Sequence, residues 1–367
     1  MCLTRFALPV LLLAAASGSA LAQGLGDVTL AAIPQYVSIK IGTGASAKTV
    51  SQFSMPLVAV VPIGSRFNID VATAYANSDV STNGKSASSI NGLTDTQVRA
   101  NWTLGNDAAV ITIGVNVPTG QYKIPEGNAE AAGQIGNDFL IFPTSSYGSG
   151  LSTTGGLALA RSLGTWNLGI AGSFRKSTAF DAFQAKNGST LETLTFTPAD
   201  EMRARVGIDR AIGDGRLSFG VTYSSFGSDQ YLSHSYATGD RFIGQATLYV
   251  PVAGTDVYVS GWSLYRAKGE QLGGVSNPET VSDGSVALGL HVGNVLVEPS
   301  VEGRFWQVDG VKAGALGNFG GRLRFSTGSL TILPGFTYQI GKLYDTANSG
   351  VSTDVTGWRT SLMVRLK

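Results

Sequence analysis

The feature that most limits what this chain can fold into is an alternation of apolar and polar residues over stretches long enough to cross a bilayer. In one stretch, Val98, Ala100 and Trp102 occupy one phase, and Arg99 and Asn101 occupy the other. Because successive side chains of a β-strand face opposite sides of the sheet, one face of this stretch suits hydrocarbon and the other suits water. A bilayer-crossing strand needs about 9 to 11 tilted residues, whereas strands of soluble proteins most often have about 5 to 6. The pattern therefore predicts a transmembrane β-barrel.

The alternation continues to the end of the chain, and no linker or low-complexity block divides it. It places sixteen strands, an even number as in bacterial barrels. Their ranges are 35–43, 50–62, 66–76, 93–104, 108–118, 152–163, 165–175, 200–212, 215–226, 240–251, 255–267, 282–292, 295–306, 315–326, 329–340 and 354–366. The first two are the weakest, because residues 24–49 could instead form a periplasmic arm or a small plug. We predict an all-β fold, a single antiparallel barrel of 14–16 strands.

Short turns rich in Gly, Asn and Asp alternate with much longer polar loops. In membrane barrels the short turns are periplasmic and the long loops extracellular, so both termini should lie on the periplasmic side. The tight connections are at Gly64-Ser65, Gly105-Asn106-Asp107, Gly164, Gly213-Asp214, Ala253-Gly254, Gly293-Asn294 and Thr327-Gly328.

The N-terminus has the parts of a secretory signal peptide. A basic residue precedes the apolar run at 6–16, and Ala20-Leu21-Ala22 forms a small-x-small cleavage site. The run is well short of the roughly 20 apolar residues of a membrane-spanning helix. We expect residues 1–22 to be removed and residues 23–367 to form a barrel in the outer membrane of a Gram-negative-type bacterium.

Composition fits a barrel better than a bundle of helices. Of 367 residues, 48 are Gly and only 14% are charged. No segment after the signal peptide approaches 18 consecutive apolar residues, which excludes helical membrane spans. Lys and Arg number 26 against 25 Asp and Glu, and this balance gives no reason to expect nucleic acid as a partner.

Groups suited to catalysis are few. Cys2 leaves with the signal peptide, so the mature chain has no thiol nucleophile. His234 lies in a predicted loop and His291 on a strand, and both read as structural or solvated residues. No His/Cys cluster has metal-ligand spacing, and the Gly-rich segments lack the strand-to-helix context of a phosphate loop. We predict no enzyme activity, no metal and no cofactor.

Charged residues gather on the polar phase of the strands. An Arg at the midplane of the lipid face would cost about 2 to 4 kcal/mol, so these residues should face the lumen. The predicted pore-lining residues are Arg99, Arg175, Arg203, Arg205, Arg241, Glu298, Glu302, Arg304, Arg322 and Arg324. Most can pair across neighbouring strands and stiffen the barrel, and those near the waist can also favour anionic or polarisable solutes.

Aromatic residues on the apolar phase should face lipid, several of them in girdles at the two membrane interfaces. They are Phe67, Tyr75, Trp102, Trp166, Phe174, Tyr223, Phe305, Tyr338 and Trp358.

Two loops are long enough to have a function of their own. Residues 121–150 and 177–199 both contain apolar residues that are unusual in a water-exposed loop. The candidates for contact with a solute are Phe139, Leu140, Phe142, Phe180 and Phe183. Two interpretations stand side by side: the loops fold over one another as an outer cap, or they catch or gate an apolar solute.

One segment resembles a known family. Asn91-Gly92-Leu93-Thr94-Asp95, the strand through Trp102, the strand 109–117 and the end Val117-Pro118-Thr119-Gly120 are similar to the outer-membrane family associated with meta-pathway phenol degradation, a relative of FadL-like transporters. The match covers roughly thirty residues. It implies a substrate class of hydrophobic or aromatic small molecules. FadL-like channels carry a sizeable N-terminal hatch, whereas residues 23–34 are too short for one.

These patterns predict an outer-membrane channel for passive uptake of small, hydrophobic or aromatic solutes. The alternatives are a general diffusion porin, which would fold a long loop inward to a charged constriction, and an adhesive or structural barrel with a closed lumen. The expected partners are outer-membrane lipid, a small-molecule solute and the barrel-assembly machinery.

Overall fold

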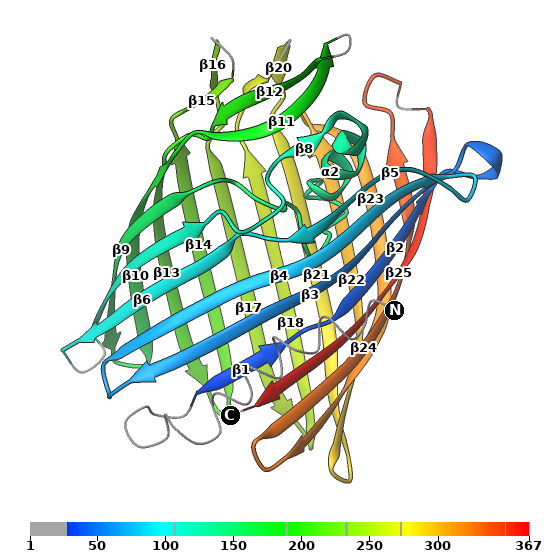
Figure 1. Cartoon of the computed structure of the whole chain (residues 1–367). Helices are drawn as coiled ribbons and strands as arrows, with labels where there is room; N and C mark the ends of the chain where they lie inside the picture. The colour runs from blue at the N-terminus through cyan, green and yellow to red at the C-terminus, as the bar shows by residue number, and fades with distance from the viewer. Residues whose placement is uncertain are drawn as a thin grey trace.

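The wall of the molecule is one closed antiparallel β-barrel of sixteen strands (Figure 1). The computed structural model describes residues 28–105, 108–187, 190–231, 234–271, 274–348 and 350–366, so the predicted signal peptide lies outside the described residues. Neighbouring strands follow the order of the chain. The circle closes where the last strand, β25 (Ser352–Leu366), pairs with β1 (Thr29–Ala32) and β2 (Gln35–Ile41).

Each of the sixteen predicted strands overlaps one wall strand. β1 and β2 are two pieces of the first wall strand, interrupted at Ile33 and Pro34. β5 (Lys85–Leu93) and β6 (Thr96–Leu104) are two pieces of the fourth, interrupted at Thr94 and Asp95. The described residues from 28 to 49 belong to the wall, so the alternative of a plug or arm is wrong for them and the larger strand number is correct. The remaining wall strands are β3 (Lys48–Ile63), β4 (Phe67–Thr82), β7 (Ala109–Val117), β9 (Ser152–Leu163), β10 (Trp166–Ser177), β13 (Glu201–Ile212), β14 (Gly215–Phe226), β17 (Arg241–Val252), β18 (Thr255–Arg266), β21 (Glu279–Val292), β22 (Val295–Val308), β23 (Val311–Thr327) and β24 (Leu330–Tyr344).

The two rims of the barrel differ. One, which we call the turn rim, carries the tight turns such as Gly64-Ser65 and Gly213-Asp214. The other, the loop rim, carries the long connections. Leu366 pairs with both Leu30 and Leu330 beside the turn at 328, so both described chain ends lie at the turn rim.

Strict alternation of tight turns and long loops is wrong at two hairpins of the loop rim. β4 and β5 are joined through Asn83-Gly84, and β22 and β23 through Asp309-Gly310, with positive φ at all four residues. Positive φ at both central positions defines a type I′ turn, for which Asn-Gly and Asp-Gly are the preferred pairs. These strands therefore run beyond the predicted ends instead of opening into loops.

The outer face of the wall is an apolar surface. The register places all nine predicted lipid-facing aromatics on the outward phase, and Trp102 and Phe305 leave 53% and 59% of their surface exposed. Exposure of so many large apolar side chains on a closed sheet fits contact with hydrocarbon.

Neighbouring residues of one strand test this assignment of faces. Met202 lies on the outer face of β13 and Arg203 on the inner face. In liposomes, a lipid-soluble thiol reagent should label the Met202→Cys variant and a membrane-impermeant reagent should label Arg203→Cys. The opposite result would mean that the strand phase is inverted.

Short elements occupy the long connections. A five-stranded sheet lies above the loop rim, with the order β16 (His234–Ala237), β15 (Ser228–Tyr231), β12 (Thr190–Thr197), β11 (Phe180–Asn187) and β8 (Ile124–Pro125), and a separate hairpin consists of β19 (Gly269–Gln271) and β20 (Gly274–Ser276). The helical elements are η2 (Gly44–Ser46), η3 (Glu126–Asn128) and α2 (Ala129–Ile135). None of the helices among the described residues has the length and the apolar run that a bilayer-spanning helix requires.

Candidate functional site

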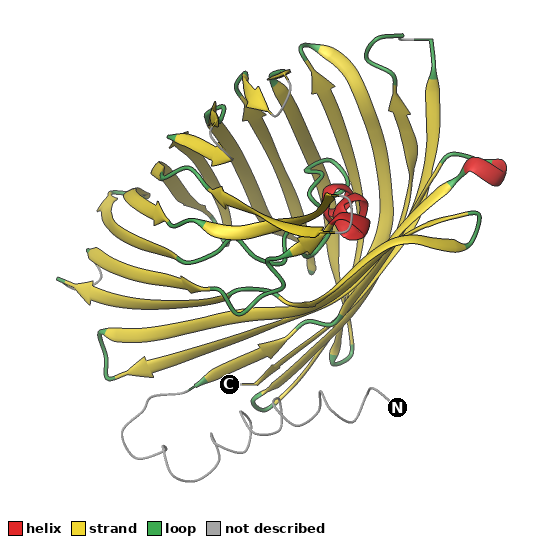
Figure 2. Cartoon of the chain, turned by 45° about the horizontal axis from the view of Figure 1, so that its top comes forward, coloured by secondary structure: helices red, strands yellow, loops and turns green. Residues whose placement is uncertain are grey.

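The connection between β7 and β9, residues 118–151, folds into the barrel, and we call it the inward loop. Figure 2 shows α2 and its flanking coil inside the ring of strands. The chain enters and leaves the lumen at one point, because a Cβ added to Gly148 would lie 2.7 Å from the Cβ of Tyr122. Asp95, in the interruption between β5 and β6, holds this point by accepting hydrogen bonds from the backbone N–H groups of Gly120 and Ser149.

The apolar residues of the inward loop pack against the inner wall. Phe139, Leu140 and Phe142 are almost fully buried, and the Phe139 ring stacks on Trp306 with 5.4 Å between centroids. A Cβ at Gly314 would lie 2.7 Å from that ring, so the wall has no side chain where the ring sits. The wall side of this cluster consists of Val37, Ile39, Val50, Ala76, Val80, Ile90, Val281, Leu316 and Val355.

This packing bears on both interpretations of the loop, the outer cap and the contact with a solute. The first part of the inward loop meets the second long loop, because β8 pairs with β11. The cap interpretation is wrong for α2 and its flanking coil, which lie inside the ring of strands (Figure 2). Phe139, Leu140 and Phe142 have almost no exposed surface that a passing solute could contact. Each contributes about 1.5 to 3 kcal/mol by burial, which holds the loop against the wall.

Polar groups fix the position of the loop along the wall. Gln52 on β3 donates from Nε2 to the Thr144 carbonyl (2.7 Å) and accepts from the Thr144 backbone N–H at Oε1 (2.8 Å). The hydroxyls of Ser54 and Thr144 are 2.8 Å apart. The Gln52 amide thus pairs with the loop backbone as a neighbouring β-strand would. Gln52 and Thr144 are both buried.

A buried tyrosine makes a second attachment. The Tyr147 hydroxyl donates to the Ile90 carbonyl at 2.8 Å and lies 2.9 Å from the Ser78 hydroxyl. Burial raises the pKa of Tyr147 to about 12, with the Ser78 hydrogen bond acting in the opposite direction. The phenol therefore remains neutral, and able to donate, throughout the physiological pH range.

Two arginines of the wall bind backbone carbonyls of the inward loop. Arg304 donates to the Phe139 carbonyl at 2.9 Å, and Arg359 donates to the Ile141 carbonyl at 2.7 Å. Arg304 also pairs with Asp283 (3.0 Å) and Glu302, and only 5% of its side chain is exposed. Arg304 and Glu302, both predicted as pore lining, therefore belong to the attachment of the loop.

Other predicted lumen arginines reach water. Arg203 pairs with Glu201 and Arg322 with Glu298; the two carboxylate side chains are 5% and 3% exposed, but the two arginines are 53% and 54% exposed. Arg175 and Arg324 are second partners of the same carboxylates, at 3.3 and 3.6 Å. Each buried carboxylate thus orients two arginines. Each set of one carboxylate and two arginines therefore has a net positive charge, which faces the lumen.

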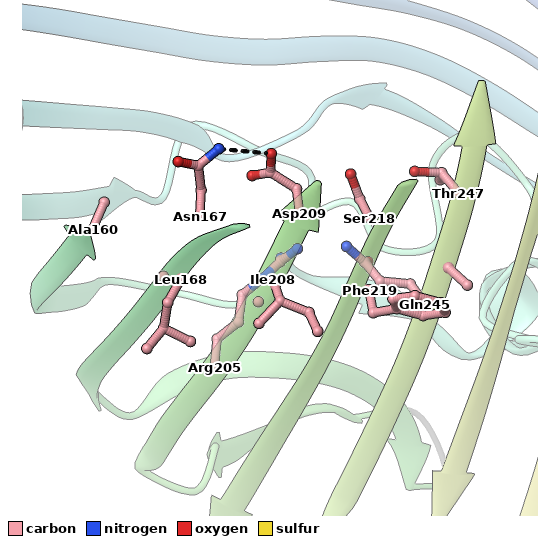
Figure 3. Close-up of a pocket in the computed structure, with 13 residues that line it drawn as sticks. Ala160, Asn167, Leu168, Arg205, Ile208, Asp209, Ser218, Phe219, Gln245 and Thr247 are labelled. Carbon is pink, nitrogen blue, oxygen red and sulfur yellow. Dashed lines mark hydrogen bonds between the residues drawn. The ribbon is translucent and has the colours of Figure 1, made fainter. Parts of the chain in front are cut away.

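Arg99, Arg205 and Arg241 have no ion pair among the described residues. Arg99 donates to Gln97 at 2.9 Å, and the Arg241 guanidinium lies 5.2 Å from the centre of the Phe226 ring. Arg205 lines a lumen cavity of about 280 Å³ together with Gln245 on β17 (Figure 3). A cavity of about 540 Å³ shares Ser218 and Thr247 with the first and extends to the wall around Arg322.

The second long loop lies at the mouth. β11 and β12 form a hairpin in which Phe180 meets Phe196 edge to face, and Phe180 also meets Tyr122 of the inward loop. Phe183 meets Tyr231 in the same way and remains 38% exposed. The cap interpretation fits this hairpin, and Phe183 is its one predicted solute-contact residue with a large exposed surface.

Sequence reasoning did not find Gln52, Ser78, Tyr147 or Gln245. A usable signal existed in β2, where Val37 and Ile39 face inward and Ser38 and Lys40 face outward, the reverse of the membrane pattern. Apolar residues on the inner face of a strand indicate that another segment of the chain packs against that part of the wall.

Metal ligands and histidines are the side chains that would bear on other kinds of chemistry. The described residues contain no group of three His, Cys, Asp or Glu side chains placed to hold a metal ion. His234 lies beside Tyr236 at the mouth, and His291 is exposed on β21.

No protein-family model matches the chain, and no curated protein matches it. Solved structures that resemble it include OprB of Pseudomonas putida, with 12% identity and a TM-score of 0.46 over 94% of this chain and 95% of that chain. OmpTdeltaL8, a loop-deletion mutant of an outer membrane protein of Vibrio cholerae, has 9% identity and a TM-score of 0.44 over 93% and 98%. OccAB2 of Acinetobacter baumannii has 9% identity and a TM-score of 0.38 over 93% and 98%.

Proposed function

We propose that this chain is an outer-membrane channel through which small polar solutes diffuse passively, with the inward loop narrowing the lumen. The observation that carries the proposal is that charged side chains of the inner wall remain accessible to water, although the inward loop is attached to that wall. Inward-facing Arg203, Arg322 and Arg216 leave 53%, 54% and 64% of their side chains exposed. An adhesive barrel with a packed lumen would bury these groups.

The membrane location follows from the outer face. Apolar side chains such as Ile113, Val221 and Phe319 are more than half exposed on the outside of the closed wall. In water such a surface would aggregate, whereas in a bilayer it faces hydrocarbon. The closed sheet also leaves no unpaired edge in lipid, which is the condition for a β-structure to span it.

A general diffusion channel fits the inward loop better than a dedicated hydrophobic channel does. A long loop folded inward to a charged constriction is the arrangement expected of a general porin. A hydrophobic channel would need an apolar path, and the apolar residues of the loop are turned to the wall. The second candidate, uptake of aromatic solutes as the family resemblance implies, is favoured by exposed Phe183 beside Tyr231 at the mouth.

Reconstitution into planar bilayers tests the proposal. We expect stepwise, ohmic single-channel currents in KCl, and swelling of liposomes in a small neutral sugar. If neither currents nor swelling were observed, the channel proposal would be wrong and an adhesive or structural barrel would be favoured.

The same preparation separates the two candidates. For a channel of aromatic solutes, Phe183→Ser should slow phenol entry and leave sugar entry unchanged, whereas Val275→Ser, at an exposed apolar residue on β20, should affect neither. For a general channel, phenol entry should be the same in the Phe183→Ser variant and the unmodified protein.

A further inference from the structure

Two hydrogen-bond donors without partners converge in the lumen. They are the guanidinium of Arg205 on β13 and the amide of Gln245 on β17 (Figure 3). Strand β14 runs between β13 and β17, and its Gly220 lies between the two side chains. A Cβ at Gly220 would lie 3.5 Å from Nη2 of Arg205 and 3.3 Å from Nε2 of Gln245, so these nitrogens are at most 6.8 Å apart. Among the described residues, neither side chain has a hydrogen bond or an ion pair.

The nearest carboxylates do not neutralise Arg205. Asp209, four residues further along β13, is 3.1 Å from both Nδ2 of Asn167 and Nη2 of Arg216. Glu201 is occupied by Arg203 and Arg175. One full positive charge is therefore left at Arg205.

The surroundings of the two donors are open and small. Arg205 and Gln245 are exposed to the lumen and line the cavity of about 280 Å³, with Gly220 buried beneath them. Gly207 is paired with Gly220 across the strands and adds no side chain to the floor. Hydroxyls of Ser218 and Thr247 line the same cavity.

We infer that Arg205 and Gln245 form a binding station for a small monocarboxylate on its way through the lumen, an inference that rests on the proposed channel function. A guanidinium matches the two oxygens of a carboxylate, and N–H···O bonds of about 2.9 Å from each side let one carboxylate bridge donors this far apart. A single uncompensated charge suits a monoanion better than a dianion. The amide donor gives the carboxylate an orientation that chloride cannot use.

Acetate is the probe for this station. In planar bilayers at fixed KCl, added acetate should reduce the chloride current in a saturable way, because a bound carboxylate occupies the path. Arg205→Gln and Gln245→Leu should each raise the half-blocking acetate concentration by about threefold or more. The control is Arg210→Gln, which removes an arginine from the outer face of the same strand and should leave the block unchanged.

A substitution at Gly220, beneath the two donors, tests the station by adding a negative charge instead of removing a donor. Gly220→Asp would place a carboxylate of the protein between the two donors, so acetate should no longer block and the preference for anions should fall. Gly220→Asn, with the same shape and no charge, should retain the anion preference at least in part. Binding of ¹³C-labelled acetate to the detergent-folded protein, followed by NMR line broadening, reports on the site without any current.

The outcomes separate the two proposals. Absence of channel currents together with specific acetate binding would overturn the channel and leave the station standing as a binding site. Normal currents with acetate indistinguishable from chloride, or equal loss in Arg205→Gln and Arg210→Gln, would overturn the station and leave the channel.

Discussion

Excising residues 123–147 and joining Tyr122 to Gly148 through a short glycine linker should raise single-channel conductance by about threefold or more, since conduction is limited by the narrowest section of the lumen. The close approach of Tyr122 and Gly148 makes the excision geometrically possible without moving β7 or β9. Measurement in planar bilayers at 1 M KCl, where surface charges are screened within about 3 Å, isolates the change in width.

A second excision provides the control. The hairpin Phe180–Thr197 lies over the mouth, and its flanking residues Ser177 and Ala199 are already joined by a hydrogen bond of 3.4 Å. Its removal should change conductance far less than removal of the inward loop. Similar changes in the two variants would mean that the mouth, not the inward loop, limits the flow.

Arg304→Met should lower the free energy of unfolding by about 3 to 5 kcal/mol, because it leaves the buried Asp283 carboxylate and its neighbour Glu302 without their cation. The variant also loses the hydrogen bond to the Phe139 carbonyl, so the inward loop should become less ordered and the current noisier. Urea unfolding in lipid vesicles, followed by tryptophan fluorescence, measures the first effect.

Lys342→Met is the matched control for that loss. Lys342 and Asp354 also form an ion pair between neighbouring strands, but both side chains are about half exposed. Exposed pairs contribute about 0 to 1 kcal/mol, so this variant should be nearly as stable as the unmodified protein. Equal losses in the two variants would show that Arg304 acts only as one more surface charge.

The strands could be predicted from the sequence because alternation is a local property. A strand such as β14 pairs with neighbours over its whole length, and its two faces meet lipid and water directly. Strand ends at the loop rim were less predictable. Asn83-Gly84 and Asp309-Gly310 are short turn signals inside segments otherwise typical of loops.

The destination of the inward loop could not be predicted from local pattern. Its apolar residues require a partner surface, and the pattern does not say whether that surface is another loop, a solute or the inner wall. For the same reason, the sequence pattern does not distinguish arginines that bind the inward loop from arginines that face the open lumen. Arg304 and Arg205 are alike in sequence, both on the polar phase of a strand, but only Arg304 meets a loop carbonyl that originates 165 residues away.

The pairing of Leu30 with Leu366 has a consequence for how the molecule is made. The first and last strands of the wall are neighbours, so the ring cannot close until the whole chain has been synthesised and exported. Until then β1, β2 and β24 each expose an open edge with unpaired N–H and C=O groups, the kind of surface that recruits other chains into aggregates. Contacts of such long sequence separation also form slowly. We therefore expect unfolded chains to depend on periplasmic chaperones, and truncation of β25 to cause degradation of the protein instead of assembly of a smaller barrel.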